Sequence, residues 1–289
     1  MFKKKKDQTY QSYWSISWNI FKKNKVAMVC LFIVILLCLI ALFAPLIAPY
    51  DPNKQVLTDR LMKPCGQHLF GTDDLGRDIF SRIIYGCRVS LSVGIISQII
   101  ATVIGYTMGV CAGYYGGKVD SVISFLIQVF SSFPFLLFAM AIMFVLGPGL
   151  INLYLALGLL GWASTARLIR GDVMRLKKME YIDACKVSGG NSFRIIMKHL
   201  LPNCLSTLIV TVTLDIPNAI MSEASLSFLG LGVKAPMASW GSMISFSQPY
   251  IRSATYYSVI PGLAIIITVL AFNMLGDGLR DALDPKLRS

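Results

Sequence analysis

Residues 26–48 read VAMVCLFIVILLCLIALFAPLIA, a stretch without one charged side chain. A helix rises about 1.5 Å per residue, so this stretch is long enough to cross the roughly 30 Å hydrocarbon core of a membrane. Lysines precede it, as they precede the apolar core of a secretory signal peptide. That core is usually shorter, and further apolar stretches follow here, so we predict an uncleaved first transmembrane helix.

The composition of the whole chain also indicates a membrane protein. Of its 289 residues, 55% are hydrophobic and only 15% are charged, whereas soluble domains are nearer to about 25% charged. The net charge of +12 comes from basic blocks between the apolar stretches, which favours contact with anionic lipid over nucleic acid. The seven cysteines include no Cys-x-x-Cys pair, so we expect no disulfide framework.

Five further apolar stretches predict an all-α polytopic membrane protein with six transmembrane helices. They lie at about residues 90–113, 122–146 (with a kink at Pro134), 150–169, 204–221 and 257–275. The predicted segments are a basic, amphipathic start (1–25), the first helix (26–48), an extracytoplasmic loop (49–80) and a core domain (81–289) with a cytoplasmic loop at about 172–202 and an extracytoplasmic loop at about 223–256.

The distribution of basic residues predicts the orientation of these helices. An even number of spans places both termini and the 172–202 loop on one side of the membrane. That side carries most of the lysine and arginine, including Lys3–Lys6, the block from Arg167 to Lys198, Lys286 and Arg288. Basic residues mark the cytoplasmic side, so we expect both termini and this loop in the cytoplasm.

The longest polar segment between two apolar ones is EYIDACKVSGGNSFRIIMKHLLP, residues 180–202. We predict a helix over Glu180–Val187, a turn at Gly189 and Gly190, and a second helix over Ser192–Leu201. In this prediction Ser192 is the N-cap of the second helix and Pro202 ends it. Two short helices around a glycine turn suit a groove on another protein, although an ordinary solvated loop explains the charges equally well.

Two sets of residues inside the predicted spans are candidates for a role. Small residues recur every four positions at Ser97, Ala101, Gly105, Gly109 and Gly113, which favours a helix-packing face over a ligand site. On the fifth span, Asp215, Asn218 and Glu223 are candidates for a translocation pathway, because a carboxylate in a membrane normally faces an interior or a water-filled path. A packing hydrogen bond near Pro217 explains Asp215 equally well, and solvation at the outer end of the span explains Glu223.

Known catalytic and metal-binding motifs are missing from the sequence. It contains no GxxxxGK[ST], HExxH, GxSxG or CxxC motif, so we predict no catalytic residues and no ATP site on this chain. Cys65 and His68 form a lone pair of possible ligands, whereas structural zinc usually needs four. We therefore predict no bound metal or cofactor.

The segment 180–202 resembles the EAA loop of bacterial ABC importer permeases. The matching residues are Asp183-Ala184-Cys185, then Gly189, then Leu201-Pro202; Asp183, Cys185 and His199 depart from the usual residues. The flanking sequence resembles the dipeptide/oligopeptide/nickel branch and its C-type permease, through Glu180–Ala184, Lys198–Asn203, Phe70–Asp78, Gly113–Gly117, Glu223–Gly232, Ser239–Gly241 and Ala271–Asp281.

The resemblance implies the type I ABC importer permease fold, in a bacterial plasma membrane, with no catalytic function. It implies a second permease, two cytoplasmic ATPases that hold ATP and Mg, and an extracytoplasmic solute-binding protein that meets the loops 49–80 and 223–256. The cargo would be di-/oligopeptides, nickel or metal–metallophore chelates. Contact with an ATPase would come from Glu180, Tyr181, Asp183, Ala184, Cys185, Ser188, Gly189 and Gly190.

Two other classes of protein stay open at this stage. A secondary transporter would use intramembrane ionisable groups and inverted repeats, yet only Asp215 lies deep in a predicted span and no repeat is evident. A channel or a membrane scaffold is the other alternative. Both alternatives fit the segment 180–202 less well than an importer does.

Overall fold

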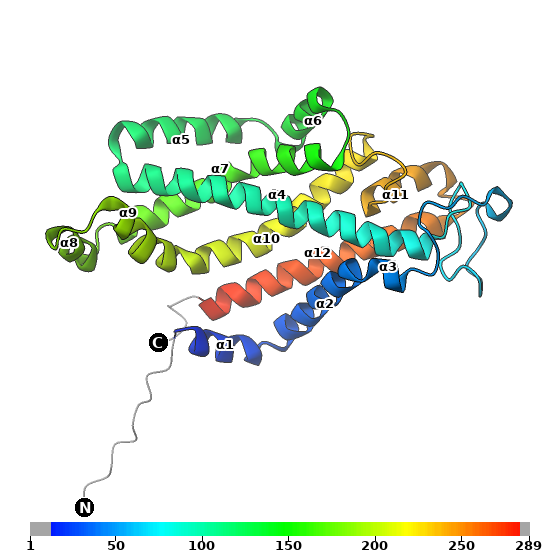
Figure 1. The fold of residues 1–289 in the computed structure, drawn as a ribbon, viewed down its shortest axis with the longest axis horizontal. Helices are drawn as coiled ribbons and strands as arrows, with labels where there is room; N and C mark the ends of the chain where they lie inside the picture. Colours follow the sequence, from blue (N-terminus) through cyan, green and yellow to red (C-terminus); the bar gives the residue numbers. More distant parts are fainter. Residues whose placement is uncertain (1–12, 284–289) are drawn as a thin grey trace, which may run out of the picture.

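The fold is a bundle of long helices with short elements at both ends. The computed structural model describes residues 13–283, and no strand occurs within that range. In Figure 1 the long helices lie along one common direction, with α1 and α8 at one end of the bundle and α11 and the loop before α4 at the other. The helices are α1 (Tyr13–Lys23), α2 (Lys25–Leu42), α3 (Ala44–Ile47), α4 (Ile79–Tyr115), α5 (Gly117–Ser132), α6 (Phe135–Leu146), α7 (Leu150–Leu176), α8 (Glu180–Val187), α9 (Ser192–Ile195), α10 (Leu201–Phe228), α11 (Trp240–Ser247) and α12 (Thr255–Leu283).

Four helices between residues 13 and 283 are long and apolar enough to cross a membrane, and α5 and α6 together make a fifth if they are one span. The four are α2, α4, the continuous helix Ser192–Phe228 and α12. The remaining predicted span corresponds to α7, which has the necessary length at 27 residues. Its charged residues, together with its glycine, asparagine, serine and threonine residues, lower its apolar character, so the count of six stays a prediction.

The predicted span 122–146 is broken in two. Helix α5 ends at Ser132, α6 begins at Phe135, and the two axes differ by 90°. Pro134 between them has no backbone N–H to donate to a preceding carbonyl, and it disfavours a helical conformation at Phe133. The predicted kink is therefore a sharp corner that separates two helices (Figure 1).

Helix α4 begins eleven residues before the predicted start at residue 90. Asp78 is its N-cap, and its carboxylate accepts hydrogen bonds from both the backbone N–H and the hydroxyl of Ser81, each at 2.7 Å. These bonds satisfy donors that the first turn of a helix leaves free. Asp78, the last residue of the loop before α4, is thereby tied to the start of the helix.

Helices α4 and α7 pack closely through the small-residue face of α4. A Cβ atom on Gly105 would lie 2.7 Å from the Trp162 carbonyl oxygen, and one on Gly109 would lie 2.7 Å from that of Ala166. On Gly113 it would lie 2.9 Å from the Arg170 carbonyl oxygen. Backbone-to-backbone contact of this kind requires residues without a side chain. The face Ala101, Gly105, Gly109 and Gly113 thus lies against α7, where a Cβ atom on Gly161 would lie 3.1 Å from the Ala101 Cβ.

The predicted amphipathic start is described only in part, because Lys3–Lys6 lie outside residues 13–283. At the other terminus, Lys286 and Arg288 also lie outside the described range. Helix α1 is amphipathic in the described part. Phe21 is buried among α2 and α12 residues, while Trp18 is exposed with the Lys22 ammonium over its ring. This arrangement is typical of a helix lying along a membrane surface.

Candidate functional site

The first candidate region is the tip formed by α8, the following turn and α9. The apolar residue Ile182 is fully buried and holds α8 against a cluster that includes Val173, Ile195 and Leu200. The neighbouring positions Glu180, Tyr181, Asp183 and Ala184 are exposed. The buried side chain of Ile182 holds α8 in place, and the opposite face of the helix remains exposed to solvent.

A glycine turn ends α8, as the sequence predicts. The N–H of Ser188 donates to the Ala184 carbonyl (3.0 Å), and the N–H of Gly190 donates to that of Cys185 (2.9 Å). Gly189 has φ +79°, a left-handed conformation that suits glycine. A Cβ atom on Gly190 would lie 2.6 Å from the Cys185 sulfur and 2.7 Å from its carbonyl oxygen. Gly189 is thus required by its conformation, and Gly190 by the close approach of Cys185.

Two details of the predicted second helix are wrong. Its N-cap is Asn191, whose side-chain oxygen accepts the Arg194 N–H at 2.8 Å, and Ser192 is the first helical residue. Pro202 does not end the helix, because a π-helical turn over Ile196–Leu200 precedes it and leads directly into α10. A wide turn of this kind tolerates a proline near the start of the next helical segment, where its missing N–H is least costly.

The tip is therefore joined without a break to a long helix. The Leu201 N–H donates to the Ile196 carbonyl, and the helix runs from Ser192 to Phe228. Exposed apolar side chains lie at its start and at the end of α8: Phe193 is 72% exposed and Val187 is 89% exposed. Sequence reasoning singled out neither residue, although both are apolar residues in a polar segment.

The second candidate region is a cavity of about 720 Å³ between α4, the α5–α6 corner, α7 and α10. Asp215 and Asn218 line it, together with Gln98 on α4. The amide nitrogen of Gln98 donates to the Asp215 carboxylate at 3.4 Å. Among the described residues, no lysine, arginine or histidine lies within ion-pair distance of Asp215.

Glu223 lies elsewhere and is not solvated. It is fully buried, accepts a hydrogen bond from Ser227 at 2.7 Å and another from Ser90 at 3.3 Å, and does not line the cavity. Burying a carboxylate costs less free energy when hydroxyl groups donate hydrogen bonds to it. The structure thus separates Glu223 from Asp215 and Asn218.

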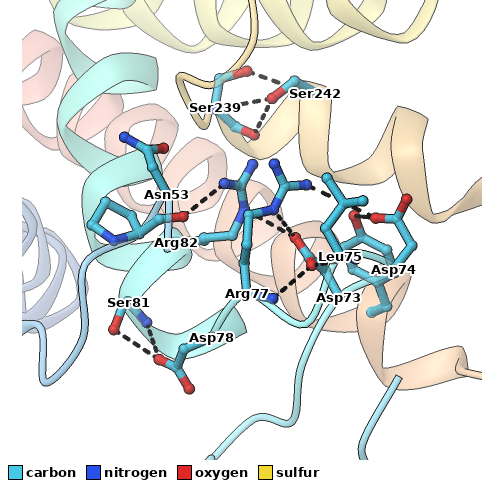
Figure 2. Close-up of polar contacts among 12 residues, drawn as sticks. Asn53, Asp73, Asp74, Leu75, Arg77, Asp78, Ser81, Arg82, Ser239 and Ser242 are labelled. Carbon is cyan, nitrogen blue, oxygen red and sulfur yellow. Dashed lines mark hydrogen bonds and ion pairs between the residues drawn. The ribbon is translucent and has the colours of Figure 1, made fainter. Parts of the chain in front are cut away.

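A cluster of charged side chains at the opposite end of the bundle was not foreseen from the sequence. Figure 2 shows Asp73 between Arg77 and Arg82, with Asp78 and Ser81 beside them. The Arg77 Nε donates to Asp73 at 2.6 Å, the Arg82 Nε lies 3.5 Å from the same carboxylate oxygen, and Arg82 also donates to the Pro52 carbonyl at 2.9 Å. In the sequence, the four-residue spacing of Asp73 and Arg77 was the one feature that could have indicated this ion pair.

These charges hold the loop before α4 on the bundle. Asp73 is fully buried, Arg82 is 1% exposed, and Tyr257 on α12 donates to Asp74 at 3.2 Å. His68 pairs with Asp78 through Nδ1 at 2.8 Å. No group of three or more His, Cys, Asp or Glu side chains suited to a metal ion occurs among residues 13–283. Charged side chains of the segment Phe70–Asp78 thus form contacts within the protein. A partner would therefore contact the exposed residues next to this segment.

Comparisons with known proteins agree with these features. A family profile described as "Binding-protein-dependent transport system inner membrane component" matches residues 102–289, and one described as "N-terminal TM domain of oligopeptide transport permease C" matches residues 12–64.

Relatives include the dipeptide transport system permease protein DppC of Bacillus subtilis, 46% identical over 96% of this chain and 87% of that protein. The oligopeptide transport system permease protein OppC of the same organism is 42% identical over 96% and 91% of the two chains. The glutathione transport system permease protein GsiD of Pectobacterium atrosepticum is 41% identical over 98% and 95%.

A solved structure of the MetNI methionine ABC transporter, in an inward-facing conformation, has a similar fold. Its TM-score is 0.57 at 19% identity, over 71% of this chain and 98% of that one. At this identity the likeness concerns the fold alone.

Proposed function

Because the chain belongs to the family of binding-protein-dependent transport system inner membrane components, we propose that its cargo is a di- or oligopeptide. It is a permease subunit of an ABC importer and a non-catalytic membrane component. The observation that carries the choice of cargo is the set of relatives at 41–46% identity, which are permeases for dipeptides, oligopeptides and glutathione. Nickel and metal–metallophore chelates are the alternative cargo.

The cavity beside Asp215 is the part of the pathway that this chain contributes. Its volume of about 720 Å³ falls within the range of roughly 300–1,000 Å³ that is common for small-molecule sites. Hydroxyl and amide groups of Gln98, Asn218, Ser222 and Ser225 line it, and such groups can replace the water around a peptide backbone. A second permease supplies the facing wall.

The tip formed by α8 and α9 is the contact for a cytoplasmic ATPase. Its exposed residues include Tyr181, Val187 and Phe193, with an Asp183–Lys186 ion pair of 2.8 Å on the same surface. Apolar side chains rimmed by charges are typical of a surface that docks in a groove on another protein. Glu180, Ala184, Cys185, Ser188, Gly189 and Gly190 complete this contact.

The unbroken helix from Ser192 to Phe228 supplies the mechanical link. When two ATPases close on ATP and Mg, the tip moves with them, and the rigid helix carries that displacement to Asp215 and Asn218. Nucleotide binding and hydrolysis thereby bias an equilibrium between inward-open and outward-open pathways. This chain binds no cofactor of its own in the mechanism.

Orientation follows the same scheme. Six spans, with α7 and the α5–α6 pair each counted as one, place α1, α8 and the end of α12 in the cytoplasm of a bacterial cell. The end that carries α11 and the loop before α4 then faces a solute-binding protein. Its exposed residues include Leu57, Leu69 and Met237.

The test of coupling is Gly189→Asp in the complete importer reconstituted in proteoliposomes. The left-handed φ of +79° at this position strains a residue with a Cβ atom, and aspartate adds a negative charge to the exposed tip, so we expect loss of transport-coupled ATP hydrolysis with an intact membrane fold. Gly117→Asp is the matched control, because Gly117 is exposed, also has a left-handed φ (+53°), and a Cβ atom there would meet nothing within 4 Å. Unchanged uptake in Gly189→Asp would exclude the coupling role.

The test of cargo is uptake by the wild-type importer. We expect labelled di- and tripeptides to accumulate with ATP and the solute-binding protein, and nickel or a nickel chelate not to compete. Accumulation of nickel with no accumulation of peptide would replace this proposal with the alternative.

A further inference from the structure

The cavity beside Asp215 combines one acidic side chain with many neutral polar ones. Its walls carry Ser97, Gln98, Ser131, Ser164, Asn218, Ser222 and Ser225, and Asp215 is its one titratable lining residue in the described part of the chain. The cavity wall contributed by this chain therefore has a negative charge when Asp215 is ionised.

No lysine, arginine or histidine among residues 13–283 forms an ion pair with the Asp215 carboxylate. Within residues 13–283, the amide of Gln98 donates to the Asp215 carboxylate at 3.4 Å, and the Asn218 side chain also hydrogen-bonds to it. Arg167 on α7 is exposed and does not line the cavity, and its guanidinium donates to the lining residue Ser131 at 3.0 Å. A half-buried carboxylate at membrane depth is costly without a partner. The electrostatic attraction between Asp215 and a cation in the cavity is therefore stronger than it would be in water.

The corner between α5 and α6 adds aromatic side chains to the same cavity. Phe130, Phe133 and Phe135 line it, and the last two flank Pro134 at the 90° bend. Aromatic rings attract ammonium and guanidinium groups to their faces. Carboxylate, ring faces and hydroxyls are the chemistry that recognises an organic cation.

We propose that Asp215 is a specificity-determining residue that favours cargo with a cationic group near it. The inference rests on the proposed function of this cavity as a peptide pathway. Peptides with a lysine or arginine side chain are then passed more readily than acidic peptides of the same length. Asn218 and Ser222, one and two turns further along α10, line the cavity without this discrimination.

The experiment compares uptake of Ala-Lys-Ala and Ala-Glu-Ala by the complete importer in proteoliposomes with one solute-binding protein. For each variant, the ratio of Ala-Lys-Ala uptake to Ala-Glu-Ala uptake is divided by the same ratio for the wild type. Any peptide preference of the solute-binding protein then cancels. We expect Asp215→Asn to lower the lysine-to-glutamate uptake ratio about tenfold, as for loss of one charge-assisted contact. Asp215→Glu should retain the wild-type ratio, and Ser222→Ala should leave it unchanged.

A second variant keeps the test decisive if Asp215→Asn does not assemble. Ser222→Arg places a cation on the same wall of the cavity and should shift the ratio toward Ala-Glu-Ala. Equal loss of both peptides in Asp215→Asn, or an unaltered ratio in both variants, would overturn the inference. If the wild type takes up neither tripeptide, the proposed function fails instead.

Discussion

The hydroxyl of Ser90 on α4 donates a hydrogen bond to the carboxylate of Glu223 on α10 at 3.3 Å, although 133 residues separate them in the chain. The Ser90 hydroxyl oxygen also accepts a hydrogen bond from the backbone N–H of Trp240, at the start of α11, at 3.2 Å. Ser227 donates to the other carboxylate oxygen of Glu223 at 2.7 Å. One hydroxyl thus joins three helices at the end of the bundle opposite α8.

Ser90→Ala should destabilise the folded protein. The substitution removes a donor from buried Glu223 and an acceptor from the Trp240 N–H, and each unsatisfied buried group costs about 1–3 kcal/mol. We expect a lower midpoint of thermal unfolding for the purified permease in detergent. Ser121→Ala is the control, because the Ser121 hydroxyl is exposed and bonds only to the Gly117 carbonyl one turn earlier. Equal midpoints for the two variants would contradict this account of Ser90.

Asp73→Asn should release the loop before α4 from the bundle. The change leaves the buried Arg77 and Arg82 guanidinium groups without the carboxylate between them, and removal of one partner from a buried ion pair costs about 3–5 kcal/mol. We expect faster proteolysis within residues 49–80. The exposed pair of Arg60 and Tyr250 is the control, since Arg60→Gln should cost about 1 kcal/mol or less. A loop equally resistant in both variants would show that the ion cluster does not hold it.

Gly109→Ala should separate α4 from α7. Its Cβ atom would lie 2.7 Å from the Ala166 carbonyl oxygen and 2.9 Å from the Ile169 Cβ, and overpacking of this kind costs about 1–3 kcal/mol. Gly171→Ala is matched to it, because Gly171 also lies in a helix but a Cβ atom there meets nothing within 4 Å. That control should gain up to about 1 kcal/mol from the higher helix propensity of alanine. Unfolding midpoints that move in the same direction would contradict the packing role.

Gly190→Ala should impair coupling more than Gly189→Ala does. At Gly189 the new methyl group has open space and only the left-handed backbone is strained, at a cost of about 1–2 kcal/mol. At Gly190 the methyl group meets the Cys185 carbonyl oxygen at 2.7 Å, so the turn must open. We expect the larger loss of peptide-stimulated ATP hydrolysis for Gly190→Ala, with no rescue by Cys185→Ala because the carbonyl remains. Full coupling in Gly190→Ala would contradict this.

The elements best predicted from the sequence are those with local causes. The helix over Glu180–Val187 and the turn at Gly189 follow from helix-forming residues and a glycine pair. The choice of Ser192 over Asn191 as N-cap was wrong, because either residue can cap and the backbone decides which one is outside the helix. The end assigned to Pro202 was also wrong, because a π-helical turn over Ile196–Leu200 leads directly into α10, and Pro202 lies in the first turn of that helix, where its missing N–H is tolerated.

The sequence by itself determined that this is a helical membrane protein with a glycine turn in its polar segment, since uncharged length and backbone preference act over a few neighbouring residues. Only the tertiary structure decided the places of its polar side chains. It set Asp215 in a cavity, buried Glu223 beside Ser90, and enclosed Asp73 between two arginines. The physical reason is that the cost of burying a charge depends on partners that helix packing brings together from distant parts of the chain.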